Sequence, residues 1–172
     1  MFRIATKNDK ENLCELWQQG FNEGQKEASF VFESFADYKN IYIKEENNSP
    51  IAMLISVDVE MSGKKGAYFY GLTTLPQYQK NGVMSKLIDE VCDELKTLGY
   101  TFAVLIPQDK TLFDFYEKRG FKTQFYLRHF SHTVKSNVFV KADFDTVTAK
   151  SLRGLRRKFI KGQRVELNEK SE

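Results

Sequence analysis

The sequence predicts one α/β domain in which a mixed β-sheet carries helices on both faces. Its 172 residues fit the usual length of a single domain. Strand and helix patterns alternate along the chain, as they do in this fold class. Residues 102–106 form an uninterrupted apolar run, which is expected of a strand that is buried on both faces.

The first part of the chain predicts a strand, two helical segments and a three-strand meander. Alternating residues indicate the first strand, and Asp9 is placed to cap the helix that follows. Apolar side chains then recur at helical spacing. The predicted segments are a strand at 2–5, helical segments at 13–21 and 30–38, and strands at 41–44, 51–61 and 67–73.

The second part predicts the most regular helix of the chain, which starts near Gly82 and ends at Gly99. Apolar residues from Met84 to Leu98 fall on one face of this helix. The segments after it are predicted as a strand at 102–106, a short helix at 112–118, strands at 121–130 and 134–141, and a helix at 146–162.

Charge divides the chain into a mildly acidic domain at 1–145 and a basic C-terminal helix and tail at 146–172. Seven bases and no acid lie within residues 150–164, whereas 19 bases face 23 acids elsewhere. Three interpretations of this basic segment stay open: a docked helix with a solvated charged face, a contact to an acidic partner, and nucleic-acid binding. The last is the least favoured, because no recognition motif accompanies the charge.

Composition also restricts location and cofactors. No run of about 18 apolar residues predicts a membrane span. The N-terminus lacks the pattern of a secretory signal, so we expect a cytoplasmic protein without membrane contact. Cys14 and Cys92 fall at apolar helical positions, as reduced thiols would. Neither these cysteines nor His129 and His132 have the spacing of a zinc site, so we expect no metal.

The most informative segment runs from Gly71 to Leu87, where a strand ends, a short loop turns and the strong helix begins. The first four N–H groups of a helix lack helical partners and carry roughly half a positive charge, which favours an anion. The segment has neither the Gly-Lys-Ser/Thr of a phosphate-binding loop nor a Gly-x-Gly-x-x-Gly fingerprint. The residues alone leave two alternatives, an anion site and an ordinary strand–turn–helix junction.

Two short motifs add to this picture, with one predicted helix and one predicted strand between them. The first motif lies in the loop and the second in the short helix after the buried strand. They read Gln79-x-x-Gly82-x-Met84 and Phe115-Tyr116-x-x-x-Gly120-Phe121.

In this order, the motifs resemble those of the GNAT superfamily of N-acetyltransferases, and the resemblance covers roughly residues 2–130. The first motif is similar to the signature Gln/Arg-x-x-Gly-x-Gly/Ala, with Met84 at the last position, which resembles the Eis-like branch. The resemblance implies the GNAT fold and the transfer of an acetyl group from acetyl-CoA to an amine. It also implies no covalent enzyme intermediate.

The resemblance assigns roles to individual residues. Tyr116 matches a tyrosine that serves as general acid, and a tyrosine with a pKa near 10 is protonated at neutral pH. Its alternative role is packing on an amphipathic helix. Gly71 is expected to mark a bulge that separates its strand from the next one. The residues expected to bind acetyl-CoA are Leu72, Thr73, Thr74, Gln79, Lys80, Asn81, Gly82, Val83, Met84 and Ser85.

No motif identifies the amine acceptor or the base that deprotonates it. Candidate bases are four acids that are otherwise solvated carboxylates: Glu27, Glu33, Asp58 and Glu60. Aromatic residues that line the acceptor entrance or form core are Phe30, Phe32, Phe35, Tyr38, Tyr68 and Tyr70.

Two further functions stay open beside the acetyltransferase. One is a non-catalytic acyl-CoA-binding module with the same fold. The other is a nucleic-acid-associated protein that uses residues 150–164. Since members of the family often form dimers, a homodimer is also kept open.

Overall fold

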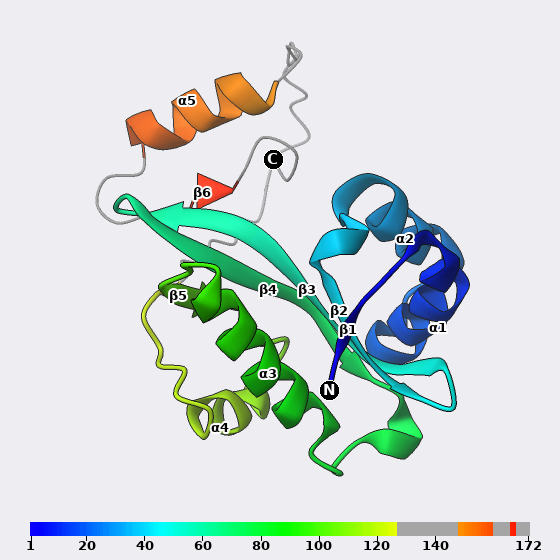
Figure 1. The fold of residues 1–172 in the computed structure, drawn as a ribbon. Helices are drawn as coiled ribbons and strands as arrows, with labels where there is room; N and C mark the ends of the chain where they lie inside the picture. The colour runs from blue at the N-terminus through cyan, green and yellow to red at the C-terminus, as the bar shows by residue number, and fades with distance from the viewer. Residues whose placement is uncertain (127–147, 160–165, 168–172) are drawn as a thin grey trace, which may run out of the picture.

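The computed structural model of the chain describes residues 1–126, 148–159 and 166–167. Within them, six strands form one sheet in the order β1-β2-β3-β4-β5, and β6 pairs with β3. Neighbouring strands are antiparallel except β4 and β5, so the sheet is mixed, as predicted (Figure 1). The strands are β1 (Arg3–Ile4), β2 (Ile41–Glu46), β3 (Ser49–Met61), β4 (Lys64–Thr74), β5 (Phe102–Val104) and β6 (Glu166–Leu167).

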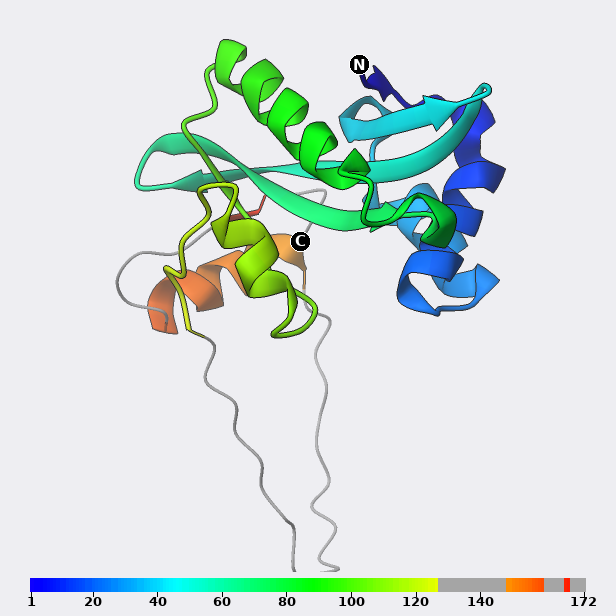
Figure 2. The ribbon, with the colours of Figure 1, turned by 90° about the horizontal axis from the view of Figure 1, so that it is seen from below.

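Helices cover both faces of the sheet, which also agrees with the sequence. Figure 2 shows the blue helices α1 and α2 at the right of the strands and the green helices α3 and α4 toward the left. Trp17 of α1 packs with Ile55 in one core cluster, and Leu87 of α3 packs with Leu54 in the other. The helices are α1 (Lys10–Phe21), α2 (Gln25–Phe30), α3 (Val83–Thr97), α4 (Leu112–Glu117) and α5 (Ala149–Phe159).

A β-bulge at Gly71 interrupts the ladder between β3 and β4. Ile55 pairs with Tyr70 and Met53 pairs with Thr73, so Leu54 opposes two residues of β4. Gly71 adopts a left-handed backbone, with φ at 61°. The extra residue reverses the alternation of faces, because one inserted residue turns every later side chain to the other side of a strand. The bulge expected from the sequence is therefore present.

The pairing of β4 with β5 ends well before β4 does. The last paired residues are Tyr68 and Val104, and β4 continues to Thr74. Beyond Tyr68, the edge of β4 that faces away from β3 has no partner strand among the described residues. A free edge of this kind presents unpaired backbone N–H and C=O groups.

The strand β5 differs from its prediction, because it is shorter and only half-buried. It ends at Val104, and Ile106 beyond it is 64% exposed. Within the described residues, β4 is its single neighbour, so the other edge of β5 lacks a strand that would extend the buried layer. The apolar run at 102–106 therefore predicted the strand correctly, but the prediction that both faces of this strand are buried is wrong.

Other segments of the second part also depart from the prediction. Residues 121–126, the described part of the strand predicted at 121–130, have no regular structure. Phe125 and Tyr126 are exposed there, so alternation alone did not suffice without a partner strand. The strand predicted at 134–141 lies outside the described residues.

Asp9 does not cap α1 with its side chain. Its carboxylate instead accepts hydrogen bonds from the Thr6 backbone N–H, at 2.7 Å, and from the Arg3 guanidinium, at 2.7 and 2.9 Å. The carboxylate is buried, and the Arg3 contact lowers its pKa to about 2. The acid thus ties β1 to the start of α1 rather than satisfying the first turn of the helix.

The aromatic segment at 30–38 is helical only in parts. α2 ends at Phe30, a π-helical turn covers Val31–Phe35, and a 3₁₀ turn covers Tyr38–Asn40. Phe32 is buried in the core cluster of α1, whereas Phe30 is exposed. The segment contributes one face to the core and leaves the other to solvent.

The basic C-terminal segment is joined to the sheet through β6. Glu166 and Leu167 pair with Glu60 and Val59, along the part of β3 that β2 does not cover. The Arg157 guanidinium of α5 donates to the Glu166 carboxylate at 2.6 Å. α5 lies within the helix predicted at 146–162, and the boundary between residues 145 and 146 stays a prediction.

We expect Gly71→Ala to destabilise the protein more than Gly63→Ala, which is its matched control. The backbone is left-handed at both glycines, and in this conformation a side chain costs roughly 1–2 kcal/mol of stability. At Gly71 an added Cβ would lie 2.8 Å from the Trp17 ring, whereas at Gly63 nothing lies within 4 Å. Overpacking at Gly71 should cost roughly a further 1–3 kcal/mol. Urea unfolding of both variants measures the difference, and equal losses would contradict the packing role of Gly71.

We expect Asp9→Asn to lower the free energy of unfolding by about 2 kcal/mol at pH 7. The folded pKa of Asp9 is lowered, so its stabilisation is complete above its ordinary pKa near 3.8 and is lost as pH falls toward about 2. The difference in unfolding free energy between the wild type and the variant should therefore shrink as the pH falls from about 5 to about 2. Urea unfolding against pH checks this, with Glu11→Gln on the exposed face of α1 as control.

Candidate active site

The helix α3 begins at a left-handed glycine, and no side chain caps its first turn. Gly82 has a φ of 75°, and its carbonyl accepts the Lys86 N–H at 3.0 Å. The N–H groups of Val83, Met84 and Ser85 precede that bond and have no helical acceptors. With the positive end of the helix dipole, they form a surface that favours an anion.

The loop before α3 is fixed to the end of β4. The Gln79 side-chain amide donates to the Thr74 carbonyl at 3.0 Å, and the Tyr78 hydroxyl donates to the Glu46 carboxylate. Lys80 is exposed and left-handed, with φ at 62°. The amide of Gln79 therefore closes the loop, and the predicted contact of Gln79 with a ligand would have to come from its backbone.

The backbone of β4 after the bulge turns two residues toward the free edge. Leu75 donates its N–H to the Ile51 carbonyl of β3 at 2.9 Å. The backbone N–H and C=O groups of the residues before Leu75 therefore point alternately toward β3 and toward the free edge of β4. By this alternation, the backbone groups of Leu72 and Thr74 point away from β3. Both belong to the set of residues that the family resemblance predicts to bind acetyl-CoA.

Thr73 does not share this arrangement with its neighbours. It pairs with Met53 of β3, and its side chain lies against Gly20 of α1. Leu72 instead packs in the cluster beneath α3. Thr74 is 7% exposed, and within the described part of the chain its Oγ1 has no hydrogen-bond partner. The strand end therefore offers an unpaired buried hydroxyl next to the free edge.

Tyr116 of α4 packs in the same cluster as Leu72 and Met84. It is 8% exposed, and its ring meets those of Phe115 and Phe121 edge-on, with centroids 5.1 and 5.8 Å away. Burial raises the pKa of the Tyr116 phenol above its ordinary value. In the part of the chain that the structure describes, its hydroxyl has no hydrogen-bond partner, so a protonated donor is available.

Arg119 also reaches this junction, and the sequence reasoning did not identify it. Its guanidinium donates to the Ser85 hydroxyl in the first turn of α3 and to the Phe115 carbonyl in α4. It stacks on the Phe115 ring, 3.6 Å from the centroid. Its position inside the second motif was visible in the sequence, but its contact with the first motif was not.

The four candidate bases are spread over the molecule. Glu33 forms an ion pair with Lys10 at the surface, and Asp58 accepts a hydrogen bond of 2.5 Å from Tyr100 on the α3 face. Glu27 and Glu60 are exposed. The structure therefore does not gather these acids at the end of β4.

A different acid, Glu23, lies on the α1 face beside the aromatic residues of β4. It accepts a hydrogen bond of 2.6 Å from the Trp17 indole N–H. The Trp17 ring lies 5.5 Å from Tyr70, whose pKa is raised by burial and, to a lesser degree, by Glu23. Sequence reasoning missed Glu23, because it follows α1 without any motif. It is the carboxylate that the fold brings to the aromatic face.

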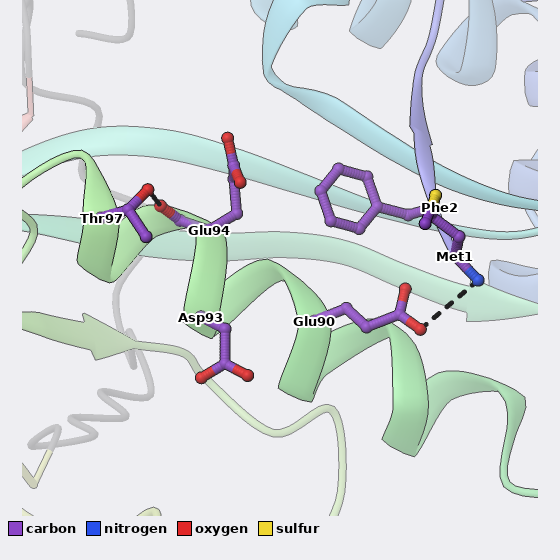
Figure 3. A pocket seen from close by; sticks show the side chains of 6 residues that line it. All are labelled: Met1, Phe2, Glu90, Asp93, Glu94 and Thr97. Atoms are coloured by element: carbon purple, nitrogen blue, oxygen red, sulfur yellow. Dashed lines mark hydrogen bonds and ion pairs between the residues drawn. The ribbon is translucent and has the colours of Figure 1, made fainter.

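A separate hollow of about 450 Å³ lies between the N-terminus and the C-terminal half of α3 (Figure 3). The Met1 amino group forms an ion pair of 3.5 Å with Glu90 at its rim. Asp93 and Glu94 also line it, so the hollow is acidic and repels phosphate. It lies toward the opposite end of α3 from Gly82 and is not part of the candidate site.

The described residues contain no group of three or more His, Cys, Asp or Glu that is arranged to hold a metal ion. His129 and His132 lie outside them. Cys14 is buried and Cys92 is half-buried, and burial raises the pKa of the Cys92 thiol to about 11. None of the described helices is long and apolar enough to cross a membrane.

Solved structures share this architecture. A transcriptional regulator from Bacillus halodurans matches with a TM-score of 0.62 and 21% identity, over 76% of this chain and 99% of that one. A GNAT family acetyltransferase from Brucella melitensis, in complex with acetyl-CoA, matches with a TM-score of 0.58 and 20% identity, over 72% and 82%. An aminoglycoside acetyltransferase from a soil metagenome, in complex with sisomicin, matches with a TM-score of 0.57 and 20% identity, over 78% and 96%.

At identities of 20–21%, these structural matches show a common fold and no more. A comparison with curated protein sequences gives no match. The sequence model described as the acetyltransferase (GNAT) domain matches residues 1–124, which include the bulge, the uncapped start of α3 and Tyr116. On that match and the shared mixed sheet, the chain belongs to the GNAT acetyltransferase family.

Proposed function

We propose that the protein is an N-acetyltransferase that transfers the acetyl group of acetyl-CoA directly to a primary amine. The observation that carries the proposal is the free edge of β4, which ends next to the uncapped first turn of α3. The edge offers backbone partners for an extended amide-containing arm, and the helix start offers N–H donors for a diphosphate. The acetyl-CoA complex of the Brucella melitensis relative supports this donor.

The residues present fit such a coenzyme. Leu72 and Thr74 would pair with its pantetheine arm, and Thr74 contributes an unpaired buried hydroxyl. Thr73 would take no direct part, because the alternation set by the Leu75–Ile51 hydrogen bond turns its backbone groups toward β3. The residues that would surround the diphosphate are Gln79, Lys80, Asn81, Gly82, Val83, Met84 and Ser85.

Acetyl-CoA supplies an activated acetyl thioester. Tyr116 would donate its phenolic proton to the leaving thiolate, since its raised pKa keeps it protonated and its hydroxyl has no competing partner in the described residues. A backbone N–H at Leu72 or Thr74 would polarise the thioester carbonyl. The acceptor amine would approach from the α1 face, where Tyr68 and Tyr70 lie. The sisomicin complex of the metagenomic relative supports an amine acceptor.

The alternatives differ from this proposal in what they require. An acyl-CoA-binding module needs the β4 edge but not the Tyr116 hydroxyl. A nucleic-acid-associated protein needs the basic segment at 150–164 and no coenzyme. The cytoplasmic location, the absence of metal and the homodimer stay predictions of the sequence.

Coenzyme A should raise the melting temperature of the protein. A ligand specific for the folded state at about 100 times its Kd stabilises by roughly 2.7 kcal/mol, which is roughly 5–10 °C for a domain of this size. A thermal unfolding titration with coenzyme A measures this shift, with adenosine as the control that lacks the phosphates and the arm. No shift at saturating coenzyme A would rule out both the enzyme and the acyl-CoA-binding module.

Tyr116→Phe should lower turnover by about a hundredfold or more, because a general acid contributes on that order. Its affinity for coenzyme A should change little, since the ring and its packing are kept. Release of free thiol during an amine screen measures turnover, and calorimetry measures binding. The matched control is Tyr42→Phe, which removes a hydroxyl from a buried tyrosine in the same core cluster. Full turnover in the Tyr116 variant would leave this tyrosine a packing role only.

A further inference from the structure

Arg119 is held rigidly between α3 and α4. It follows Lys118, the residue that caps α4, and its backbone N–H donates to the Tyr116 carbonyl at 2.9 Å. Its guanidinium contacts the Ser85 hydroxyl and the Phe115 carbonyl and lies flat over the Phe115 ring. These contacts fix both the position and the plane of the group, so little side-chain freedom is left to lose when a ligand binds.

The charge of Arg119 is not compensated within the described residues. The side chain is half-buried, and its Nε is fully buried. Among the residues that the structure describes, Nε has no hydrogen-bond partner and no carboxylate lies within ion-pair distance of the guanidinium. Its three contacts are a hydroxyl, a carbonyl and a ring, all of them neutral. Burying a cation without a counter-ion is unfavourable, so a group of this kind usually has an anionic partner.

The groups around Arg119 add to the positive potential at this position. Ser85 is the third residue of α3, so the guanidinium adjoins the positive end of the helix dipole. The positive charge of Arg119 thus lies against the first turn of α3, whose own N–H groups are a second source of positive potential. At the end of β4, the hydroxyl of Thr74 is also buried and, among the described residues, has no hydrogen-bond partner. Such a concentration of donors matches a phosphoryl group, which accepts several hydrogen bonds at once.

We propose that Arg119 binds a phosphoryl group of the acyl donor and makes the enzyme specific for phosphorylated donors over acyl-pantetheine. The inference rests on the proposed function, because it takes coenzyme A as the source of the phosphate. Phe115 and Ser85 each use one N–H of the two terminal guanidinium nitrogens, so each of these nitrogens keeps one N–H for a phosphoryl oxygen. Arg119 is therefore a specificity-determining residue that the two sequence motifs do not predict.

A purely structural clamp between α3 and α4 is the competing role of Arg119. A clamp would affect stability and the binding of every ligand to a similar degree. A phosphate contact would affect only those ligands that carry phosphate. The chemical difference between coenzyme A, its form without the 3′-phosphate, and pantetheine separates the two roles.

The test uses the full chain with Arg119→Gln, which keeps much of the side-chain volume and removes the charge. We expect the affinity for coenzyme A to fall at least tenfold by calorimetry, in line with the loss of a charge-assisted hydrogen bond. The shift in melting temperature at millimolar pantetheine should stay the same in the wild type and the variant. The matched control is Lys118→Gln, the neighbouring exposed cation, which should change coenzyme A affinity less than threefold.

Two further measurements complete the experiment. Arg119→Lys should recover most of the affinity lost in Arg119→Gln, because it restores the charge. Coenzyme A without its 3′-phosphate shows which phosphate Arg119 binds. If Arg119→Gln lowers the affinity for this ligand as much as the affinity for coenzyme A, Arg119 binds the diphosphate. If the affinity for this ligand does not change, Arg119 binds the 3′-phosphate.

Unchanged coenzyme A affinity in Arg119→Gln would overturn the inference. The inference would also be overturned if Arg119→Gln lowered the melting temperature of the free protein and reduced the pantetheine-induced shift as much as the coenzyme A affinity. Both results leave the proposed function intact, provided that the wild type binds coenzyme A. If the wild type fails to bind coenzyme A, the proposed function itself fails.

Discussion

One extra residue in β4 is the constraint on which the rest of the site depends. A strand normally sends alternate side chains to opposite faces and alternate backbone groups to opposite neighbours. Gly71 breaks both alternations, because Leu54 opposes two residues of β4. Its left-handed backbone suits glycine, and the Trp17 ring occupies the space that a Cβ would need. The N-terminal helix that carries Trp17 is therefore part of the same packed unit as the free edge.

The bulge also separates two chemical environments. Before it, Tyr68 and Tyr70 turn toward the α1 face, where Trp17 and Glu23 form a polar and aromatic surface. After it, Leu72 turns toward the cluster beneath α3. A donor that lies along the free edge and an acceptor that comes from the aromatic face would thus meet at the bulge without competing for the same side chains.

Electrostatics at the start of α3 adds a second condition. The helix lacks a side-chain cap, and the Glu46 carboxylate, which contacts its loop, accepts a hydrogen bond from the Tyr78 hydroxyl. Arg119 adds a fixed positive charge to the same region. By contrast, the acids Glu90, Asp93 and Glu94 gather on the C-terminal half of α3. This separation of charge along one helix directs an anion to the Gly82 end.

Features set by neighbouring residues were predictable from the sequence. The period of apolar residues predicted α3, and Gly99 has the left-handed backbone that is expected of a glycine at the end of a helix. The two motifs gave the site elements in the right order, because loop and helix chemistry is local. Asp9 shows the limit of such reasoning, since its carboxylate turned back to Arg3 and Thr6 instead of capping α1.

Tertiary structure alone decided which groups meet. The burial of β5 depends on a second neighbouring strand, which an apolar run cannot reveal. Arg119 and Ser85 are 34 positions apart, and a contact over that distance has no periodic signature. Glu23 reaches Trp17 only because α1 ends in a left-handed residue, Asn22, that turns the chain back. The sequence by itself thus determined the family and α3, and it predicted the loop before α3 as a candidate anion site. The fold determined the free edge of β4 and brought Arg119 to the first turn of α3.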